Sequence, residues 1–560
     1  CPPISMSSRL PKVLIRLFLV LTLVVVGIAT WFTYRIALPQ PIEGTDLPHY
    51  ERIQVGPDEY RIGNNWLRKN AFGLWEMYLE GAPFERGIIY GLLAEELIEE
   101  QEEVFIEQIR NMIPRESILK GLKYFIGWFN RDIDNYIPQE NLEEIFGISQ
   151  SFSEAYNYIG TPYYRVLNYH AAHDIGHALT DLNLVGCTSF AVTGEFSADS
   201  SLLIGRNFDF DMGDQFSKNK IILFLKPDEG YAFSSVTWAG FTGVVSGMNE
   251  KGLTVTLNAA KSDIPTKAKT PISILAREIL QYAKNIDEAI AIAQNRETFV
   301  SESILIGSAA DGKAIIIEKT PTKTAVFDSE NALTVCSNHY QSTTLAAEAT
   351  NLENIQNSDS WYRFNRMKQL ISQKKPLNPE DGVSVLRDYH GMDDKFIGYG
   401  NPKLINQFIA HHGILFQPEH RRFWVSANPY NLGSFVEYDL DQVLSSGRIS
   451  SDSPSSFSAD PILITDTFRN FEEFRHYQRL ITAHLMTGKP LELSETEVSR
   501  FISNNSESYL PYYLLGDYFF RRKEYTKAVN YYEEALKREL SSKKDEMQLN
   551  QKIAEARRHL

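Results

Sequence analysis

The sequence VGCTSFAV at residues 185–192 decides the fold, because the pattern of the chain changes there. Before it, apolar residues recur every three or four positions, as in Gly87–Phe105 and Leu142–Tyr158, which predicts helices. After it come short runs of β-branched and aromatic residues separated by turn sequences such as Asn249-Glu250-Lys251-Gly252, which predicts consecutive antiparallel strands. Cys187 therefore lies at the boundary between a helical region and a β-rich body.

The β-rich body also contains helical segments, at Pro271–Asn295 and Trp361–Ile371. The runs FIAHHGILFQ (408–417) and RRFWVSAN (421–428) predict a closing hairpin. Because strand residues alternate between faces, we expect only one of the adjacent histidines in the first run, His411 and His412, to face the sheet interior. Strands, helices and a final hairpin predict an α+β fold of packed sheets with helices outside.

An uncharged apolar run from Leu17 to Tyr34 is long enough to cross a membrane as a single helix. Arg9, Lys12 and Arg16 precede it, and the positive-inside rule then places the N-terminus in the cytoplasm and the rest of the chain outside. A cleaved signal peptide is the alternative interpretation. Cys1 lies upstream of Met6, a plausible start, and receives no role.

These patterns divide the chain into six predicted parts. They are an N-terminal anchor (1–38), a proline-containing spacer (39–60), a helical region (61–186), the β-rich body (187–444), a Ser-rich linker (445–460) and a helical tail (461–560).

Seven residues of the tail fall at the offsets of a tetratricopeptide (TPR) helix pair: Tyr512, Leu515, Gly516, Phe519, Ala528, Tyr532 and Ala535. A single repeat cannot bury both of its faces. We therefore expect it to pack on the preceding segment Phe468–Leu485, on the β-rich body or on a protein partner.

Composition excludes several classes of protein. The 560 residues are 43% hydrophobic and 23% charged, which is typical of a folded chain. The net charge of −15 argues against a nucleic-acid partner. Three cysteines, Cys1, Cys187 and Cys336, are too few for a disulfide framework in a chain of this length, and we expect Cys336 to be a core residue.

The stretches GCTSFAV (186–192) and LLIGRNFD (202–209) resemble N-terminal-nucleophile (Ntn) hydrolases of the choloylglycine hydrolase and acid ceramidase type. They are most similar to the autoproteolytic cysteine group that includes penicillin acyl-CoA:6-aminopenicillanate acyltransferase. The segment LEGAPFERG (79–87) also resembles the G-x-P-x-E-R-G opening of that group. The resemblance implies an αββα sandwich of two antiparallel sheets, preceded by a helical region and followed by a helical tail. It also implies that the precursor cuts itself between Gly186 and Cys187.

The chemistry of such a cut explains the residue types. A thiol has a pKa of about 8.5 and needs a base nearby to be a good nucleophile at neutral pH. Cutting the Gly186–Cys187 bond frees an α-amine with a pKa of about 7.7–8.0 on the nucleophile itself. Gly186 suits the close backbone packing that an attack on its carbonyl requires.

The resemblance assigns further site residues in chain order. It implies that Asp209 binds the new α-amine, that Arg206 orients the nucleophile and that Asn258 helps form the oxyanion hole. It implies that Asn338 positions substrate and nucleophile.

Arg363, preceded by Ser360, resembles the site arginine of the family. Arg366 lies one helical turn further on and is the alternative at this position.

Each of these residues also has a structural interpretation. Cys187 could be a buried core cysteine, Arg206 and Asp209 a surface ion pair, and the two asparagines caps of strands or turns. The cluster His170, His173 and His177 could hold a metal, but it lacks the glutamate of a zincin motif and more plausibly braces the cleavage region.

The predicted function is a self-processing N-terminal-cysteine hydrolase that cleaves a linear amide of an N-acyl substrate through an acyl-enzyme. The alternatives are an acyltransferase acting on an acyl thioester or amide, and a non-enzymatic, membrane-tethered TPR scaffold. No metal or organic cofactor is expected. The expected partners are a small N-acyl amide or acyl thioester, the membrane and a protein at the TPR-like unit.

Overall fold

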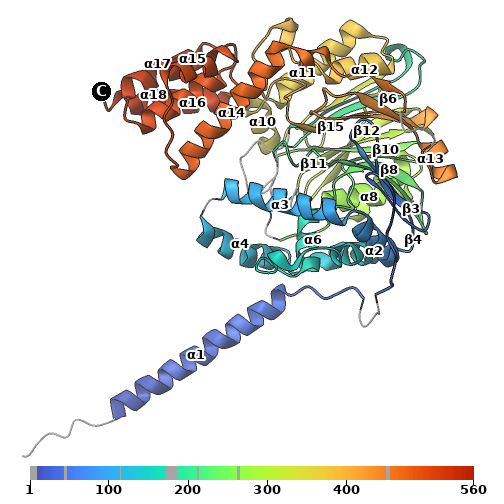
Figure 1. Ribbon diagram of the computed structural model, residues 1–560, viewed down its shortest axis with the longest axis horizontal. Helices are drawn as coiled ribbons and strands as arrows, with labels where there is room; N and C mark the ends of the chain where they lie inside the picture. The colour runs from blue at the N-terminus through green and yellow to red at the C-terminus, as the bar shows by residue number, and fades with distance from the viewer. Residues whose placement is uncertain are drawn as a thin grey trace, which may run out of the picture.

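The computed structural model describes most of the chain. The described residues are 9–42, 47–113, 115–171, 174, 186–210, 213–261, 265, 267–449 and 454–560. Figure 1 shows a body of two stacked sheets between helices, a helical C-terminal extension and a long N-terminal helix that projects away from the body.

Two sheets form the centre of the body. The first has the strand order β1-β2-β3-β4-β7-β8-β9-β10-β11-β12-β13. Its strands are β1 (Ile53–Gly56), β2 (Glu59–Ile62), β3 (Asn65–Lys69), β4 (Trp75–Gly81), β7 (Ile221–Pro227), β8 (Phe233–Thr237), β9 (Ser246–Asn249), β10 (Leu253–Ala259), β11 (Glu302–Ser308), β12 (Lys313–Lys319) and β13 (Thr324–Phe327). All neighbours are antiparallel except β4 and β7, which are parallel.

The second sheet is fully antiparallel and has the order β14-β5-β6-β15-β16-β17-β18. Its strands are β5 (Thr188–Val192), β6 (Leu203–Asp209), β14 (Leu333–Cys336), β15 (Ala410–Gln417), β16 (Arg422–Ser426), β17 (Phe435–Asp439) and β18 (Ser456–Phe457). The predicted hairpin is β15–β16, and the Ser-rich linker contributes β18 at the sheet edge.

One apolar core fills the space between the sheets. Ile222 and Phe224 of β7 pack there with Ile204 of β6 and Ile414 and Phe416 of β15. Alternate residues of each strand point to the other face, as the period of two requires. Each sheet therefore has a second apolar face that helices must cover.

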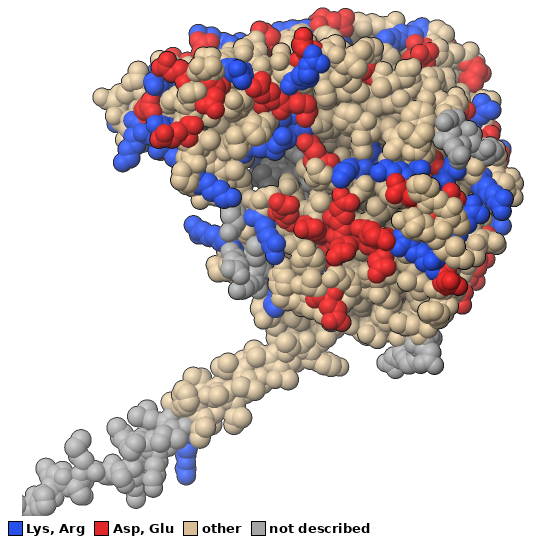
Figure 2. Space-filling model, in the orientation of Figure 1, with Lys and Arg blue, Asp and Glu red and all other residues tan. Residues whose placement is uncertain are grey.

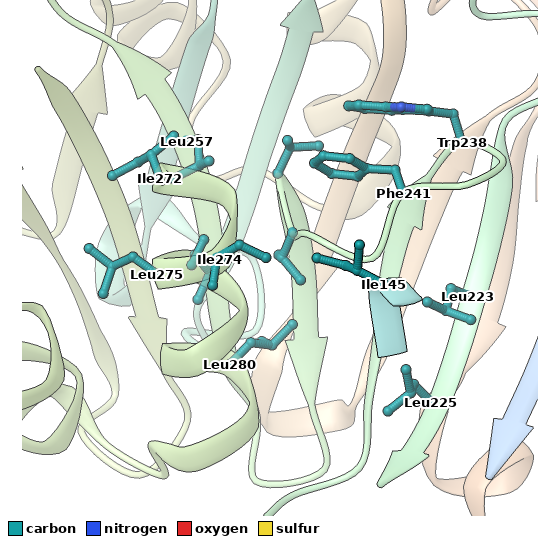
Figure 3. Packing of buried hydrophobic residues seen from close by; sticks show 14 of the residues in the cluster. Ile145, Leu223, Leu225, Trp238, Phe241, Leu257, Ile272, Ile274, Leu275 and Leu280 are labelled. Atoms are coloured by element: carbon teal, nitrogen blue, oxygen red, sulfur yellow. The ribbon is translucent and has the colours of Figure 1, made fainter. Parts of the chain in front are cut away.

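Helices cover both outer faces, which confirms the predicted αββα sandwich. Over the first sheet lie α2 (Pro83–Leu93), α5 (Gln139–Ser149), α6 (Pro162–His170), α8 (Ile272–Tyr282) and α9 (Ile286–Asn295). Figure 3 shows Ile274, Leu275 and Leu280 of α8 packed in the same cluster as Leu223, Leu257 and Trp238. Over the second sheet lie α11 (Ser360–Lys374) and α12 (Pro379–Leu386).

The G-x-P-x-E-R-G segment has a packing role in this outer layer. Gly87 of α2 lies so close to α5 that a Cβ would be 2.2 Å from the Glu144 carbonyl oxygen. Arg86 donates hydrogen bonds to the Glu144 carboxylate, as does Arg277 of α8 at 2.7 and 2.9 Å. Burial raises the pKa of Glu144, but the two arginines outweigh it and lower the pKa to about 2. This buried triad joins three helices.

The N-terminal region is helical from Pro83 onward, as predicted. Residues 53–81 differ from the prediction, which placed a spacer at 39–60 and the start of the helical region at 61. They form β1–β4, which extend the first sheet. These strands are short and carry charged residues, so neither a long apolar run nor a helical period marks them. Their place in the fold depends on β4 pairing with β7, far along the chain.

Further helices follow in this region: α3 (Glu95–Met112), α4 (Glu116–Phe129) and the short turns Ile133–Tyr136 and Glu154–Tyr156. Figure 2 shows acidic side chains gathered where α3 lies. The exposed residues there include Glu95, Glu96, Glu99, Glu103 and Glu107.

The projecting helix is α1 (Arg9–Ile36), and its residues Arg16–Ile36 are long and apolar enough to cross a membrane, with a mean hydropathy of 2.2. Its C-terminal end packs on α4, where Phe32 stacks on Trp128 with ring centroids 5.6 Å apart. Arg35 pairs with Asp132 at 3.1 Å. The membrane anchor stays a prediction.

The remaining body elements connect the sheets. They are α10 (Ala349–Asn357), α13 (Leu440–Ser446) and the short helical turns Gly194–Phe196, Met392–Asp394, Pro418–His420 and Pro461–Ile464.

The tail consists of α14 (Asp466–Thr487), α15 (Glu495–Ser503), α16 (Leu510–Arg521), α17 (Tyr525–Leu536) and α18 (Lys543–Arg557). Helices α16 and α17 form a close pair, because a Cβ on Gly516 would lie 2.3 Å from the Tyr532 ring. The pair packs on α14 and α18, and Asn401 of the body donates to the Glu539 carbonyl at 2.9 Å. The tail therefore buries its faces within the chain, and its TPR identity stays a prediction.

Candidate active site

Cys187 is fully buried immediately before β5 and forms no disulfide within the described part of the chain. Strand β6 runs antiparallel beside β5 and pairs Ser189 with Arg206. The Arg206 guanidinium thereby reaches Cys187, and its Nη2 donates to Cys187 Sγ at 3.4 Å. Arg206 also donates to Ser246 Oγ at 2.6 Å and to the Leu257 carbonyl, and lies over the Phe208 ring at 4.3 Å.

Asp209 lies at the end of β6, beside the peptide that precedes the nucleophile. Its backbone carbonyl accepts a hydrogen bond from Gly186 N at 3.1 Å. Its carboxylate accepts one from Gln407 Nε2 at 3.3 Å through Oδ2, while Oδ1 is buried without a hydrogen-bond partner among the described residues. One oxygen of this carboxyl group therefore lacks a donor among the described residues.

Gln407 is a site residue that sequence analysis missed. The same Nε2 donates to the Gly186 carbonyl oxygen at 3.1 Å, which is the carbonyl that a self-cleaving cysteine attacks. Gln407 belongs to no periodic segment, and no pattern in the sequence marks it.

Asn258 of β10 reaches the surroundings of Cys187 through Ser189 of β5. Its Oδ1 accepts from Ser189 Oγ at 2.8 Å, and its Nδ2 donates to the Cys336 carbonyl at 3.2 Å. Cys336 is buried beside β5, with no disulfide, as expected of a core residue.

Of the two candidate arginines, Arg363 is the one that contacts Cys187. Its Nη1 donates to the Cys187 carbonyl at 2.8 Å and to Thr188 Oγ1 at 2.6 Å, and its Nη2 donates to Asn338 Oδ1 at 2.8 Å. Asn338 in turn donates to the Ala259 carbonyl, and its backbone N–H donates to Ser360 Oγ. All six predicted site residues therefore lie in one connected region.

Arg366 points elsewhere on the same helix. It pairs with Asp388 at 2.9 Å and with Asp394 at 2.7 Å, and none of its hydrogen bonds goes to the residues around Cys187.

Burial dominates the electrostatics of the site. It raises the pKa of the Cys187 thiol to about 11, although the Arg206 charge opposes the shift. It raises the pKa of Asp209 to about 8, against the effect of Arg363 and Arg206. Both groups are therefore mainly neutral at pH 7 in this single chain, and a neutral thiol is a weak nucleophile.

Glu302 is a second residue that sequence analysis missed. It lies fully buried at the start of β11, and burial, reinforced by Asp174, raises its pKa well above the ordinary value. Its charge influences Cys187, so it belongs to the surroundings of the nucleophile. The sequence signal that could have found Glu302 is a glutamate as the first residue of an apolar strand.

The metal hypothesis gains no support from the described histidine. His170 Nδ1 contacts the Val166 carbonyl at 2.8 Å, and its Nε2 accepts from Thr242 N at 3.0 Å. His173 and His177 lie outside the described residues. Within the described ranges, no group of three or more His, Cys, Asp or Glu is placed to hold a metal ion.

The adjacent histidines correct one expectation. His411 and His412 are both fully buried with their Nδ1 atoms 2.9 Å apart, and the pairing of β15 with β6 has a bulge between Ala410 and His412. A bulge interrupts the strict alternation of faces.

Comparisons with known proteins cover the part of the chain that holds this site. Residues 196–427 match the family model described as acyl-coenzyme A:6-aminopenicillanic acid acyl-transferase. The match begins after Cys187 and includes the other five predicted site residues. It confirms the predicted resemblance to Ntn hydrolases of this group.

Curated relatives are distant. The chain is 24% identical over 223 residues to the N-acylethanolamine-hydrolyzing acid amidase of Caenorhabditis elegans, covering 38% of this chain and 59% of that protein. It is 24% identical over 336 residues to an uncharacterized protein of Archaeoglobus fulgidus, covering 53% of this chain and 55% of the other. The chain thus spans somewhat more than half the length of these relatives.

Similar solved structures include an ortholog of the same acid amidase from C. elegans, with a TM-score of 0.30 and 17% identity, covering 42% of this chain and 93% of that one. A mutant conjugated bile acid hydrolase from Clostridium perfringens has a TM-score of 0.32 and 15% identity, covering 49% of this chain and 97% of the other.

Proposed function

We propose that this protein is a self-processing cysteine hydrolase of the Ntn type, which cleaves a linear amide bond of an N-acyl substrate. One observation carries the proposal: the Cys187 thiol accepts a hydrogen bond from Arg206, and the carbonyl just before it accepts one from Gln407. Nucleophile, scissile carbonyl and a donor to that carbonyl are therefore together in the uncut chain.

The first reaction is the cut itself. Cys187 Sγ attacks the Gly186 carbonyl carbon, and Gln407 Nε2 stabilises the negative charge that develops on the carbonyl oxygen. The C–N bond then breaks, the thiol proton passes to the leaving nitrogen, and a thioester links Gly186 to Cys187. Water hydrolyses the thioester, which leaves a carboxylate on Gly186 and a free thiol and α-amine on Cys187.

The second reaction is turnover. The new α-amine lies beside Asp209, whose Oδ1 lacks a partner among the described residues, and we propose that this carboxylate binds the amine. The amine takes the thiol proton as Cys187 attacks the substrate carbonyl. Asn258 and backbone N–H groups hold the oxyanion, the substrate amine departs with a proton, and water releases the acid from the acyl-enzyme.

The substrate class follows from the relatives and remains part of the proposal. The C. elegans relative is named for hydrolysis of N-acylethanolamines, which are N-acyl amides. The matching family model is named for acyl transfer from coenzyme A, so an amine acceptor in place of water is the second candidate function. Both reactions share the acyl-enzyme on Cys187.

The test combines mass analysis with an activity panel. We expect the purified full chain to yield one piece ending at Gly186 and another beginning at Cys187, and Cys187→Ala to remain a single chain without activity. Cys336→Ala, which removes the other buried free thiol, should still be cut and active. A folded wild-type preparation that stays one chain would contradict self-processing.

The panel compares N-acyl amides of increasing acyl length with acyl thioesters, with and without a primary amine acceptor. Free acid as the main product supports hydrolysis, whereas a new amide in the presence of the acceptor supports transfer. Cys187→Ala that retains activity would identify another nucleophile, and activity lost to a chelator would revive the metal hypothesis.

We also propose that α1 anchors the protein, with the body on the extracytoplasmic side. Retention in the membrane pellet after alkaline extraction, together with protease access to the body in intact cells, tests the anchor and its orientation.

A further inference from the structure

A chain of buried polar side chains continues behind Arg206, away from Cys187. Arg206 Nη1 donates to Ser246 Oγ at 2.6 Å, and this hydroxyl lies 2.9 Å from His412 Nε2. His412 Nδ1 lies 2.9 Å from His411 Nδ1. All four side chains are fully buried. Ser246 belongs to β9 of one sheet and the other three to β6 and β15 of the other, so the chain crosses between the sheets.

The four side chains form one connected chain of hydrogen bonds. A guanidinium only donates, so Ser246 Oγ accepts from Arg206. One proton joins the serine hydroxyl to His412 Nε2, and another joins the two Nδ1 atoms of the histidines. Burial lowers the pKa of both histidines well below the ordinary value, in agreement with two neutral rings.

Aromatic rings hold the far end of the chain in place. The His411 ring lies 5.8 Å from Phe216 and 5.5 Å from Trp238, and the His412 ring lies 5.5 Å from Phe208. Phe208 also lies under the Arg206 guanidinium. The histidines therefore have little freedom to rotate, and neither does the serine hydroxyl that they orient.

We propose that Ser246 and His412 are positioning residues, which hold the Arg206 guanidinium against Cys187 through this ordered chain of hydrogen bonds. The proposal rests on the proposed function in taking Cys187 as the nucleophile. The Arg206 charge favours the thiolate, so its position sets how reactive the thiol is. Three other charged or titratable groups also influence this thiol, namely Asp209, Glu302 and Arg363.

The chain offers a matched control for Ser246. Ser235 on the neighbouring strand β8 is likewise buried, but its hydroxyl has no hydrogen-bond partner among the described residues. Removing either hydroxyl changes the volume equally, whereas only Ser246→Ala releases a guanidinium nitrogen. A merely structural serine would behave like the control.

The first experiment measures the pH dependence of Cys187 alkylation by iodoacetamide in the processed full chain, followed by mass analysis of the peptide that begins at Cys187. We expect Ser246→Ala to raise the apparent pKa of the thiol and to slow alkylation at neutral pH about tenfold or more, since a hydrogen bond to a charged group is lost. Turnover of a fluorogenic N-acyl-aminocoumarin should show a similar fall in kcat with KM little changed. Ser235→Ala should match the wild type in both assays.

The second experiment tests the same chain at His412, in case Ser246→Ala does not fold. His412→Gln keeps an amide group that can hydrogen-bond to the Ser246 hydroxyl, whereas His412→Leu removes the hydrogen-bond partner. We expect His412→Gln to retain most of the thiol reactivity and His412→Leu to lose it about as far as Ser246→Ala.

Two outcomes separate this proposal from the proposed function. Wild-type reactivity in Ser246→Ala or His412→Leu, with Cys187→Ala inactive, would overturn the positioning role and leave the hydrolase standing. Full turnover in Cys187→Ala, or a wild-type Cys187 that the reagent never modifies, would overturn both.

Discussion

The side chain of Gln407 closes over Gly186: its Nε2 donates to the Gly186 carbonyl oxygen at 3.1 Å, and a Cβ on Gly186 would lie 2.7 Å from that same nitrogen. A side chain at position 186 therefore displaces the donor from the carbonyl that Cys187 attacks. We expect Gly186→Ala to slow self-cleavage about a hundredfold, the usual cost of losing one oxyanion donor. The rate is measured by following the loss of the single-chain precursor by mass.

Gln407→Leu removes the same donor without touching the glycine and should give a similar defect. Gln417→Leu is the control, because that amide contacts Asp199 instead. Cleavage of Gly186→Ala at the wild-type rate would show that Gln407 does not serve the cut.

Arg363 and Arg366 lie one turn apart on α11, and their partners predict different phenotypes. Arg363 spreads its donors over the Cys187 carbonyl, Thr188 and Asn338. Lysine keeps the charge but cannot reproduce this fork, so we expect Arg363→Lys to lower kcat/KM about tenfold to a hundredfold. Arg366→Lys should keep turnover and lower Tm, because its acidic partners lie away from Cys187. Equal losses of activity in both variants would contradict this division.

Residue patterns located the nucleophile and the groups on its own and neighbouring strands. Cys187, Arg206 and Asp209 lie within a short stretch whose two strands pair with each other, so sequence order and spatial order agree. The strands of the body and its flanking helices were predictable for the same reason, since each carries its own periodicity.

Contacts between distant segments were not predictable. Gln407, Ser246 and Glu302 reach the site only because β6 pairs with β15 and the two sheets face each other. Strands β1–β4 depend likewise on the parallel pairing of β4 with β7. His411 and His412 share the interior because of a bulge, which depends on the partner strand and not on the residues themselves.

Glu144 is the centre of a buried triad, and its loss should destabilise the protein. Glu144→Gln leaves the Arg86 and Arg277 charges without a counter-charge, which costs about 3–5 kcal/mol. The neighbouring Glu143→Gln, on the outer side of α5, should have little effect on Tm. Both are compared in the Cys187→Ala background so that the chain stays in one piece.

The lowered pKa of Glu144 also sets the sign of a pH effect. Its stabilisation is present above the ordinary carboxyl pKa and is lost as the pH falls toward about 2. We therefore expect the difference in Tm between parent and Glu144→Gln to shrink on acidification. A difference that stays constant from pH 7 to pH 3 would contradict the triad's role.

Asp209 predicts a pH effect of opposite sign in the uncut chain. Burial raises its pKa to about 8, so between pH 4 and pH 8 the folded chain holds a neutral carboxyl that is ionised when unfolded. The stabilisation is present below the unfolded pKa and is lost as the pH rises, by about 1.4 kcal/mol per pH unit. In the Cys187→Ala background, Asp209→Asn should therefore raise Tm, and by more at pH 8 than at pH 5.

The exposed Asp287 supplies the control, since Asp287→Asn changes the charge by the same amount without removing a buried group. In the cut enzyme we expect the reverse outcome for activity. The α-amine of Cys187 then needs the Asp209 carboxylate as its partner, and Asp209→Asn should abolish most turnover while leaving the precursor more stable. A variant that gains stability and keeps full turnover would show that the buried carboxyl does not bind the amine, and an unchanged Tm at both pH values would show that it is not held neutral.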